Sequence, residues 1–155
     1  MRKRITPAIS KAHNPEQLKW IDLDQLATVE ITSEDSTHPI EGALLPRSGS
    51  IWRAAQTGVQ TLRLIFDSPQ NVNLIHLVFT EEYQSRTQEF VLRWSAGDGQ
   101  PLKEIVRQQY NFTPGSREIE DYLVDLNGVR ILELEIAAAI NSQDVCASLN
   151  ELRLA

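Results

Sequence analysis

The chain has 155 residues, of which 41% are hydrophobic and 23% charged, and its formal net charge is -6. This length holds one sizeable hydrophobic core, and the small number of glycines and prolines excludes a largely disordered chain. We therefore expect one globular domain.

The charge is unevenly distributed. Residues 1–19 carry +4 and residues 20–155 carry the remaining -10; the charged residues of the first segment are Arg2, Lys3, Arg4, Lys11, Lys19 and Glu16. An acidic surface repels a phosphate backbone, so we do not expect the body of the protein, residues 20–155, to bind nucleic acid. Only the basic arm, residues 1–19, is suited to such a contact.

No stretch reaches the roughly 18 apolar residues of a membrane span, and the basic N-terminus lacks the apolar segment of a signal peptide. The single cysteine, Cys146, closes no intramolecular disulfide, which agrees with a reducing compartment. We expect a cytoplasmic protein with no membrane contact.

Short runs of alternating apolar and polar residues predict a mostly β chain. The predicted strands are 27–32, 61–67, 71–79, 89–95, 122–126 and 129–136. The run 71–79 is denser in apolar residues, as in a strand covered on both faces. The segment 101–109 fits either a strand or a turn of helix.

One short helix is predicted at 39–45. Ser36 and Thr37 are suited to accepting hydrogen bonds from free helical amides, Pro39 suits a first turn, and Glu41 is favoured at the positive end of the helix dipole. Pro46 is expected to end the helix before Trp52.

Three turns are predicted between the strands. Asn127-Gly128 is the dipeptide that best closes a two-residue hairpin, and segments 96–99 and 67–71 give two further reversals. Several short strands at this spacing indicate a sandwich or a barrel.

From residue 22 to residue 155 the order of these elements resembles the galactose-binding-domain-like fold, also called the discoidin or coagulation factor type C domain. The residues that carry the resemblance are the Glu41-Gly42 step after the short helix begins, Trp52 after a loop, the Asp98-Gly99 turn and the closing segment 148–154 with Glu151. The resemblance implies a jelly-roll β-sandwich that recognises a ligand, most often a carbohydrate.

A local match points to one member family within this superfamily. Residues 33–38, Ser-Glu-Asp-Ser-Thr-His, and residues 52–55, Trp-Arg-Ala-Ala, followed by Gly58, are similar to the N-terminal domain of the X-ray repair cross-complementing scaffold proteins of single-strand-break repair. This resemblance implies a protein-interaction module, with the basic arm available for weak nucleic-acid contact.

Within residues 33–58 we expect Trp52 to fill the base of the sandwich while Arg53 covers its rim. We interpret residues 33–37 as a capping and turn device. The stretch is therefore expected to build the scaffold rather than a site.

The sequence shows no catalytic signature. The three histidines lie in separate segments without a second ligand at metal-binding spacing, and nucleophile elbows and phosphate-binding glycine loops are missing. We interpret the exposed carboxylates, such as Glu118, Glu120 and Asp121, as a solvated surface. We therefore expect a protein that is not an enzyme and needs no cofactor.

The discoidin-like resemblance also implies a structural Ca²⁺ near the acidic-Gly step and the final Glu, positions held here by Glu41 and Glu151. A longer Glu stands at 41 where the family has an aspartate, which changes the ligand geometry.

The ligand is expected at the polar loops that join the strands, because loops vary while the core stays fixed. The candidate residues come from segments 80–89, 109–118 and 141–148 and are Glu81, Tyr83, Arg86, Gln88, Tyr110, Asn111, Asn141 and Asp144. The family topology implies that the first and third segments approach one another.

Two functions remain open at this point. A sugar would stack on a planar side chain such as Tyr83 and bond through Arg86 and Asn141. A protein partner would instead use apolar and arginine anchors on a strand face or edge. We place carbohydrate or glycoconjugate recognition first.

Overall fold

The computed structural model describes residues 19–46 and 49–155, so the basic arm lies outside the described residues except for the exposed Lys19. The elements in chain order are α1 (Leu23–Leu26), β1 (Ala27–Ile31), α2 (Glu41–Leu44), β2 (Trp52–Thr57), β3 (Gln60–Glu81), β4 (Arg86–Ser95), β5 (Lys103–Phe112), β6 (Ser116–Ala137), β7 (Cys146–Leu149) and β8 (Glu151–Leu154). No helix in these two ranges has the length and apolar character needed to cross a bilayer.

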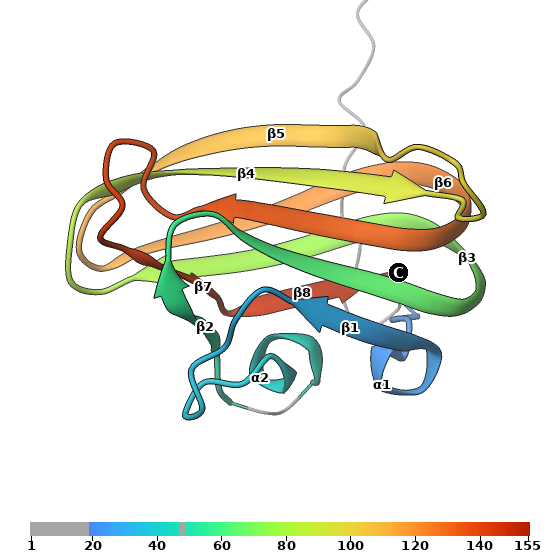
Figure 1. Ribbon diagram of the computed structural model, residues 1–155, viewed down its shortest axis with the longest axis horizontal. Coiled ribbons are helices and arrows are strands. Elements are labelled where there is room, and N and C mark those ends of the chain that lie inside the picture. The colour runs from blue at the N-terminus through green and yellow to red at the C-terminus, as the bar shows by residue number, and fades with distance from the viewer. Residues whose placement is uncertain (1–18, 47–48) are drawn as a thin grey trace, which may run out of the picture.

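The strands form an antiparallel β-sandwich, which confirms the predicted fold class (Figure 1). One layer contains β1, the first half of β3, the second half of β6, β4 and β5. The other layer contains β8, the second half of β3 and the first half of β6. A small sheet of β2 and β7 lies at one end.

Two of the predicted reversals are wrong, because β3 and β6 each run unbroken through 22 residues. Segments 67–71 and 127–128 lie opposite one another, where Gln70 pairs with Val129 and the register shifts. Gly128 has a φ of 75° and its amide donates to Asn71 Oδ1 at 3.2 Å. The Asn127-Gly128 dipeptide therefore closes no hairpin: its positive φ lies at the register shift where β3 and β6 pass from one layer to the other.

The third reversal, at 96–99, is confirmed: it joins β4 to β5, and Gly97, Asp98 and Gly99 all have positive φ. The ambiguous segment 101–109 falls in strand β5. The closing segment is two short strands, β7 and β8, which meet at Asn150.

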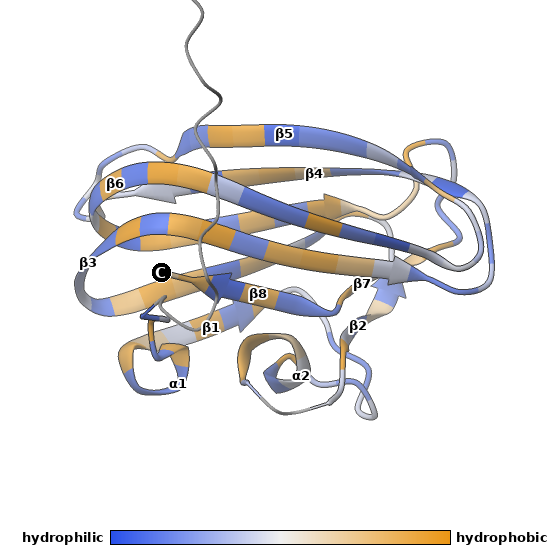
Figure 2. Cartoon of the chain, turned by 180° about the vertical axis from the view of Figure 1, so that it is seen from behind, coloured by the Kyte–Doolittle hydropathy of each residue, from blue (hydrophilic) through white to orange (hydrophobic). Residues whose placement is uncertain are grey.

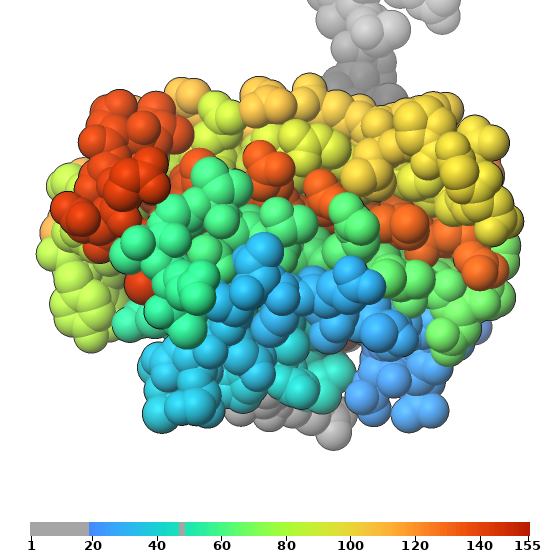
Figure 3. All heavy atoms as spheres, viewed as in Figure 1, coloured from blue at the N-terminus to red at the C-terminus, as the bar shows by residue number. Residues whose placement is uncertain are grey.

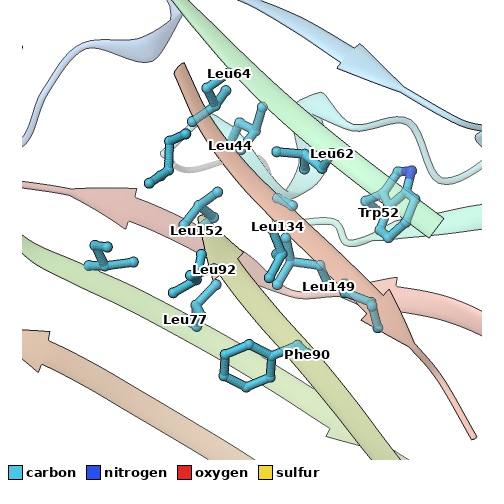
Figure 4. Close-up of a cluster of buried hydrophobic side chains, with 14 of the residues drawn as sticks. Leu44, Trp52, Leu62, Leu64, Leu77, Phe90, Leu92, Leu134, Leu149 and Leu152 are labelled. Atoms are coloured by element: carbon cyan, nitrogen blue, oxygen red, sulfur yellow. The ribbon is translucent and has the colours of Figure 1, made fainter. Parts of the chain in front are cut away.

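The alternation of apolar and polar residues along β3 and β6 places one face of each strand in the interior (Figure 2). The interior contains side chains from all of the strands and from both helices, and Figure 4 shows its central part, with Trp52 beside Leu62 and Leu149. Trp52 has 0% of its surface exposed, which confirms its predicted place in the core.

The predicted short helix is present as α2, but its cap differs from the prediction. Its N-cap residue is Ile40, whose side chain makes no capping hydrogen bond. The Ile40 amide donates instead to Glu34 Oε2 at 2.9 Å. Thr37 instead bonds to Asp35 through both its amide and its hydroxyl. The polar residues before the helix are thus used to close the turn at 35–38.

That turn extends the small sheet. The Asp35 amide donates to the Arg53 carbonyl at 2.8 Å, and the Arg53 amide donates to the His38 carbonyl at 3.1 Å. On its other side β2 pairs with β7, with Arg53 opposite Ser148. The 35–38 turn, β2 and β7 therefore lie next to one another at one end of the sandwich.

Candidate functional site

The predicted approach of segments 80–89 and 141–148 is confirmed at this end of the sandwich. The Ile140 amide donates to the Thr87 carbonyl at 2.9 Å, which ties the loop after β6 to the start of β4. Figure 3 shows these two loops and β2 gathered at the left of the molecule.

A pocket of about 540 Å³, which we call the loop-end pocket, opens between these segments. Its lining residues are His38, Ile51, Arg53, Thr80, Glu81, Glu82, Tyr83, Gln84, Arg86, Asp144, Val145, Cys146, Ser148 and Asn150. A volume of this size accepts a small ligand or one unit of a longer chain.

The floor of the pocket is the small sheet. Directly opposed residues in an antiparallel sheet present their side chains to the same face, so the register places Arg53 and Ser148 together on it. His38, whose carbonyl accepts from the Arg53 amide, lines the same pocket. On β2 the alternate residues Trp52 and Ala54 are buried in the core. The same alternation that buries Trp52 therefore presents Arg53 to the pocket.

One wall is a buried ion pair. Arg86, whose side chain is 3% exposed, donates from Nε to Glu81 Oε1 at 2.6 Å. Its Nη1 donates to Gln88 Oε1 at 2.9 Å and to the Ala138 carbonyl at 2.8 Å, and its guanidinium lies 4.4 Å from the centre of the Phe112 ring. Arg86 therefore locks the loop after β3 to β4, β5 and the end of β6.

The electrostatics of Glu81 follow from this contact. Burial by itself raises the pKa of the Glu81 carboxyl, but the hydrogen bond from the Tyr83 amide and the Arg86 guanidinium outweigh it and hold the pKa below its usual value. The pair is thus ionised and internally neutralised at pH 7, and Tyr83 is held at the tip of the loop.

The rim is exposed and polar. Tyr83 presents 78% of its surface to solvent, and Glu82, Gln84 and Asp144 are also exposed. A solvent-facing aromatic ring beside amide and carboxylate groups is an arrangement that holds a ligand with one apolar and one polar face.

His38 reaches the pocket from a fixed turn. Its Nδ1 lies 3.1 Å from Asp35 Oδ2 and 3.0 Å from Thr37 Oγ1. Hydrogen bonds from the Thr37 amide and from His38 hold the pKa of the Asp35 carboxyl below its usual value. Nε2 makes no hydrogen bond within residues 19–46 and 49–155, so it is available to a ligand.

Four of the eight predicted site residues line the loop-end pocket: Glu81, Tyr83, Arg86 and Asp144. Gln88 is buried behind Arg86, and the other three, Tyr110, Asn111 and Asn141, lie outside the lining. Asn111 accepts from Thr87 Oγ1 at 2.7 Å on the β4–β5 pair.

Sequence reasoning missed the floor residues His38, Arg53 and Ser148. For Arg53 the signal was the alternation of side chains along a strand. Because Trp52 was expected in the core, its neighbour Arg53 had to face the opposite side. Nothing in the sequence showed that another loop would close over that face.

A second cluster of titratable groups lies between the edge of β5 and the first half of β6. Glu118 and Glu120 are half-buried on the same face of β6, so of the three carboxylates interpreted as a solvated surface only Asp121 is exposed. The pKa of Glu120 is raised to about 7, mainly by burial and secondly by the neighbouring Glu118. Burial also raises the pKa of Tyr110 and of Tyr122.

Replacing Glu120 with Gln is expected to stabilise the protein at pH 8 and to have little effect at pH 4.5. The folded pKa of Glu120, about 7, exceeds the ordinary value of 4.5, so the fold favours the protonated carboxyl. Its contribution to stability is therefore full below about pH 4.5 and is lost as the pH rises through 7. Because Glu120 is only half-buried, we expect a gain of about 1–2 kcal/mol in the free energy of unfolding at pH 8.

Urea denaturation at the two pH values measures this difference. Glu30→Gln, on the exposed face of β1, is the matched control and should change the free energy by less than about 0.5 kcal/mol at either pH. An equal effect of Glu120→Gln at pH 4.5 and pH 8 would contradict the prediction.

The residues implied for calcium do not form a suitable donor set. Glu41 is exposed at the start of α2, and Glu151 Oε1 lies 3.7 Å from Arg153 Nε while its Oε2 lies 3.9 Å from His76 Nε2. In the described part of the chain no three His, Cys, Asp or Glu side chains cluster as metal ligands. A carboxylate beside an arginine is already partly neutralised, so the residues present do not fit the ion.

Solved structures with the same fold include carbohydrate-binding modules. The family 32 module of Clostridium perfringens NanJ, solved with galactose, superposes with a TM-score of 0.64 at 14% identity over 87% of this chain and 96% of that one. The family 32 module of AlyQ, solved with 4,5-unsaturated mannuronic acid, gives 0.60 at 17% identity over 89% and 98%. A pectin-binding module gives 0.60 at 15% identity over 84% and 90%.

No protein-family model matches the sequence, and no curated relative matches it either. The likeness is thus one of fold, and it confirms the expected β-sandwich architecture. The resemblance to the repair scaffold family and the protein-interaction alternative stay predictions.

Proposed function

We propose that this protein is a non-catalytic module that binds a carbohydrate or glycoconjugate in the loop-end pocket. The observation that carries the proposal is the pocket itself: an open cavity of about 540 Å³ at the loop end of the sandwich, with the exposed Tyr83 ring at its rim and polar side chains on its floor. A pyranose has an apolar face for an aromatic ring and hydroxyls for polar side chains, and the pocket offers both.

The fold supports the same function. Modules that share it were solved with galactose and with 4,5-unsaturated mannuronic acid, and a third is a pectin-binding module. A fold alone does not define a ligand, so the proposal depends on the lining residues of this chain.

The arrangement favours recognition over catalysis. Hydrolysis of a glycosidic bond uses two carboxyl groups placed on either side of the bond. Here Glu81 is neutralised by Arg86, while Glu82 and Asp144 are exposed on the rim. The carboxylate best held by the fold is therefore already occupied by a structural contact.

The proposal predicts that Tyr83→Ala weakens glycan binding by about 5- to 20-fold, the loss expected for removing one stacked aromatic ring. Because the side chain is solvent-exposed, the melting temperature should change by no more than about 2 °C. Isothermal titration calorimetry against oligosaccharides selected on a glycan array measures the affinity.

Ile119→Ala is the matched control, since Ile119 is 51% exposed and does not line the pocket. It should bind as the wild type does. Glycan binding that is unaffected by Tyr83→Ala would place the ligand elsewhere, and an array on which the protein binds nothing would refute the proposed function.

A further inference from the structure

Two arginines line the loop-end pocket, and Arg53 is the one whose charge no ion pair within the described residues compensates. Arg86 is paired with Glu81, and on the neighbouring strands Arg63 and Arg93 are both paired with Glu133. The Arg53 side chain has neither an ion pair nor a side-chain hydrogen bond within residues 19–46 and 49–155, although it is half-buried.

A partly desolvated guanidinium with five unused donors is costly unless something else binds it. Arg53 lies on the pocket floor, where access to water is narrower than at the rim. Its planar fork matches one kind of group especially well, a carboxylate that accepts two parallel hydrogen bonds.

The neighbours of Arg53 on the floor support an anionic ligand. His38 lines the pocket; Asp35, which lies outside the lining, holds its Nδ1, and its Nε2 makes no hydrogen bond within the described residues. Ser148, opposite Arg53 on β7, adds a hydroxyl. The floor thus offers a guanidinium, an imidazole and a hydroxyl.

The acidic residues of the pocket do not cancel this charge. Glu81 is neutralised by its contact with Arg86 at 2.6 Å, and Glu82 and Asp144 are exposed on the rim, where solvent screens them. The resulting pattern is positive at the floor and negative at the edge.

We propose that the saccharide bound in this pocket carries a carboxylate, as a uronic acid unit does, and that Arg53 binds that carboxylate at the floor. The inference rests on the proposed carbohydrate function and adds the chemical class of the ligand. The rim then contacts the neutral part of the sugar, with Tyr83 against the ring.

Tri-galacturonate and its fully methyl-esterified form make the sharpest pair of probes, since they share the sugar backbone and differ in the charge of the carboxyl group. The free acid should bind the wild type about 10- to 100-fold more tightly than the ester, as expected for a charge-assisted bidentate contact. Arg53→Gln should abolish that preference, because it weakens binding of the acid far more than binding of the ester. Arg53→Lys, which keeps the charge and loses the fork, should retain part of the preference.

Arg130→Gln is the matched control: it makes the same change in net charge at a residue of β6 outside the lining, packed against Gly97 at the opposite end of the strands. Raising NaCl from 50 to 500 mM should weaken binding of the acid and spare the ester, which tests the contact in the wild-type protein even if Arg53→Gln does not fold.

The outcomes separate this inference from the proposed function. Equal affinity of the wild type for acid and ester, or an equal loss of both in Arg53→Gln, overturns the uronic acid inference while carbohydrate binding stands. If the wild type binds neutral sugars but no uronic acid, the uronic acid inference is likewise overturned and carbohydrate binding stands. Failure to bind any glycan overturns both.

Discussion

Replacing Arg86 with alanine is expected to lower the free energy of unfolding by about 3–5 kcal/mol, the range for removing one partner of a buried ion pair. The cost arises mainly because Glu81, itself buried, loses the guanidinium that compensates its charge. The substitution also removes the donors to Gln88 and to the Ala138 carbonyl and the cation that lies over Phe112.

For a domain of this size the loss corresponds to a melting temperature lower by roughly 6–20 °C. Thermal unfolding followed by circular dichroism, together with urea denaturation, measures it. Arg107→Ala is the matched control: Arg107 also lies 2.6 Å from a glutamate, Glu89, but its side chain is 47% exposed, so its loss should cost at most about 1 kcal/mol. Equal losses in the two variants would contradict the structural role given to Arg86.

A double substitution separates the buried charge from the packing. In Arg86→Met combined with Glu81→Gln, the methionine keeps most of the volume beside Phe112 and no unpaired charge remains. A large part of the stability lost in Arg86→Ala should therefore return. If the double variant is as unstable as the single one, the hydrogen bonds to Gln88 and Ala138 are the main contribution.

The role of Arg86 shows where reasoning from the sequence is limited. Its position in a polar loop between two strands made it a candidate for ligand contact, whereas the structure uses most of its donors internally. An arginine in a loop has the same sequence pattern whether its partner is a ligand or a glutamate five residues earlier. Only the tertiary arrangement, which brings Phe112 and Ala138 to the same point, distinguishes the two.

The strands themselves were largely predictable, because period-two alternation is a local property of the chain. The pattern correctly located β1, β4 and the inner faces of β3 and β6. It failed at Asn127-Gly128, since a left-handed glycine serves a hairpin and a bend equally well and only pairing with the bend at Gln70 decides between them.

The last prediction concerns Trp52, for which we expect alanine to cost about 3–5 kcal/mol in the free energy of unfolding. The ring is fully buried in the central cluster, and its Nε1 donates to the Ser33 carbonyl at 3.2 Å. Removing it leaves a cavity and an unsatisfied carbonyl in the turn that leads to His38. Urea denaturation measures the loss, and Val59→Ala, at a residue 57% exposed, is the control that should stay within about 0.5 kcal/mol.

Trp52→Phe tests how the core supports the pocket. Phenylalanine keeps an aromatic ring in the core but makes no bond to Ser33, so the stability should fall by only about 1–2 kcal/mol. Because Trp52 and Arg53 are adjacent on β2 and face opposite sides, a strand that stays in register keeps Arg53 on the floor. We therefore expect Trp52→Phe to bind the same glycans as the wild type at a temperature where it is folded. Loss of binding in a folded Trp52→Phe would mean that the indole positions the floor itself, through Ser33 and the 35–38 turn.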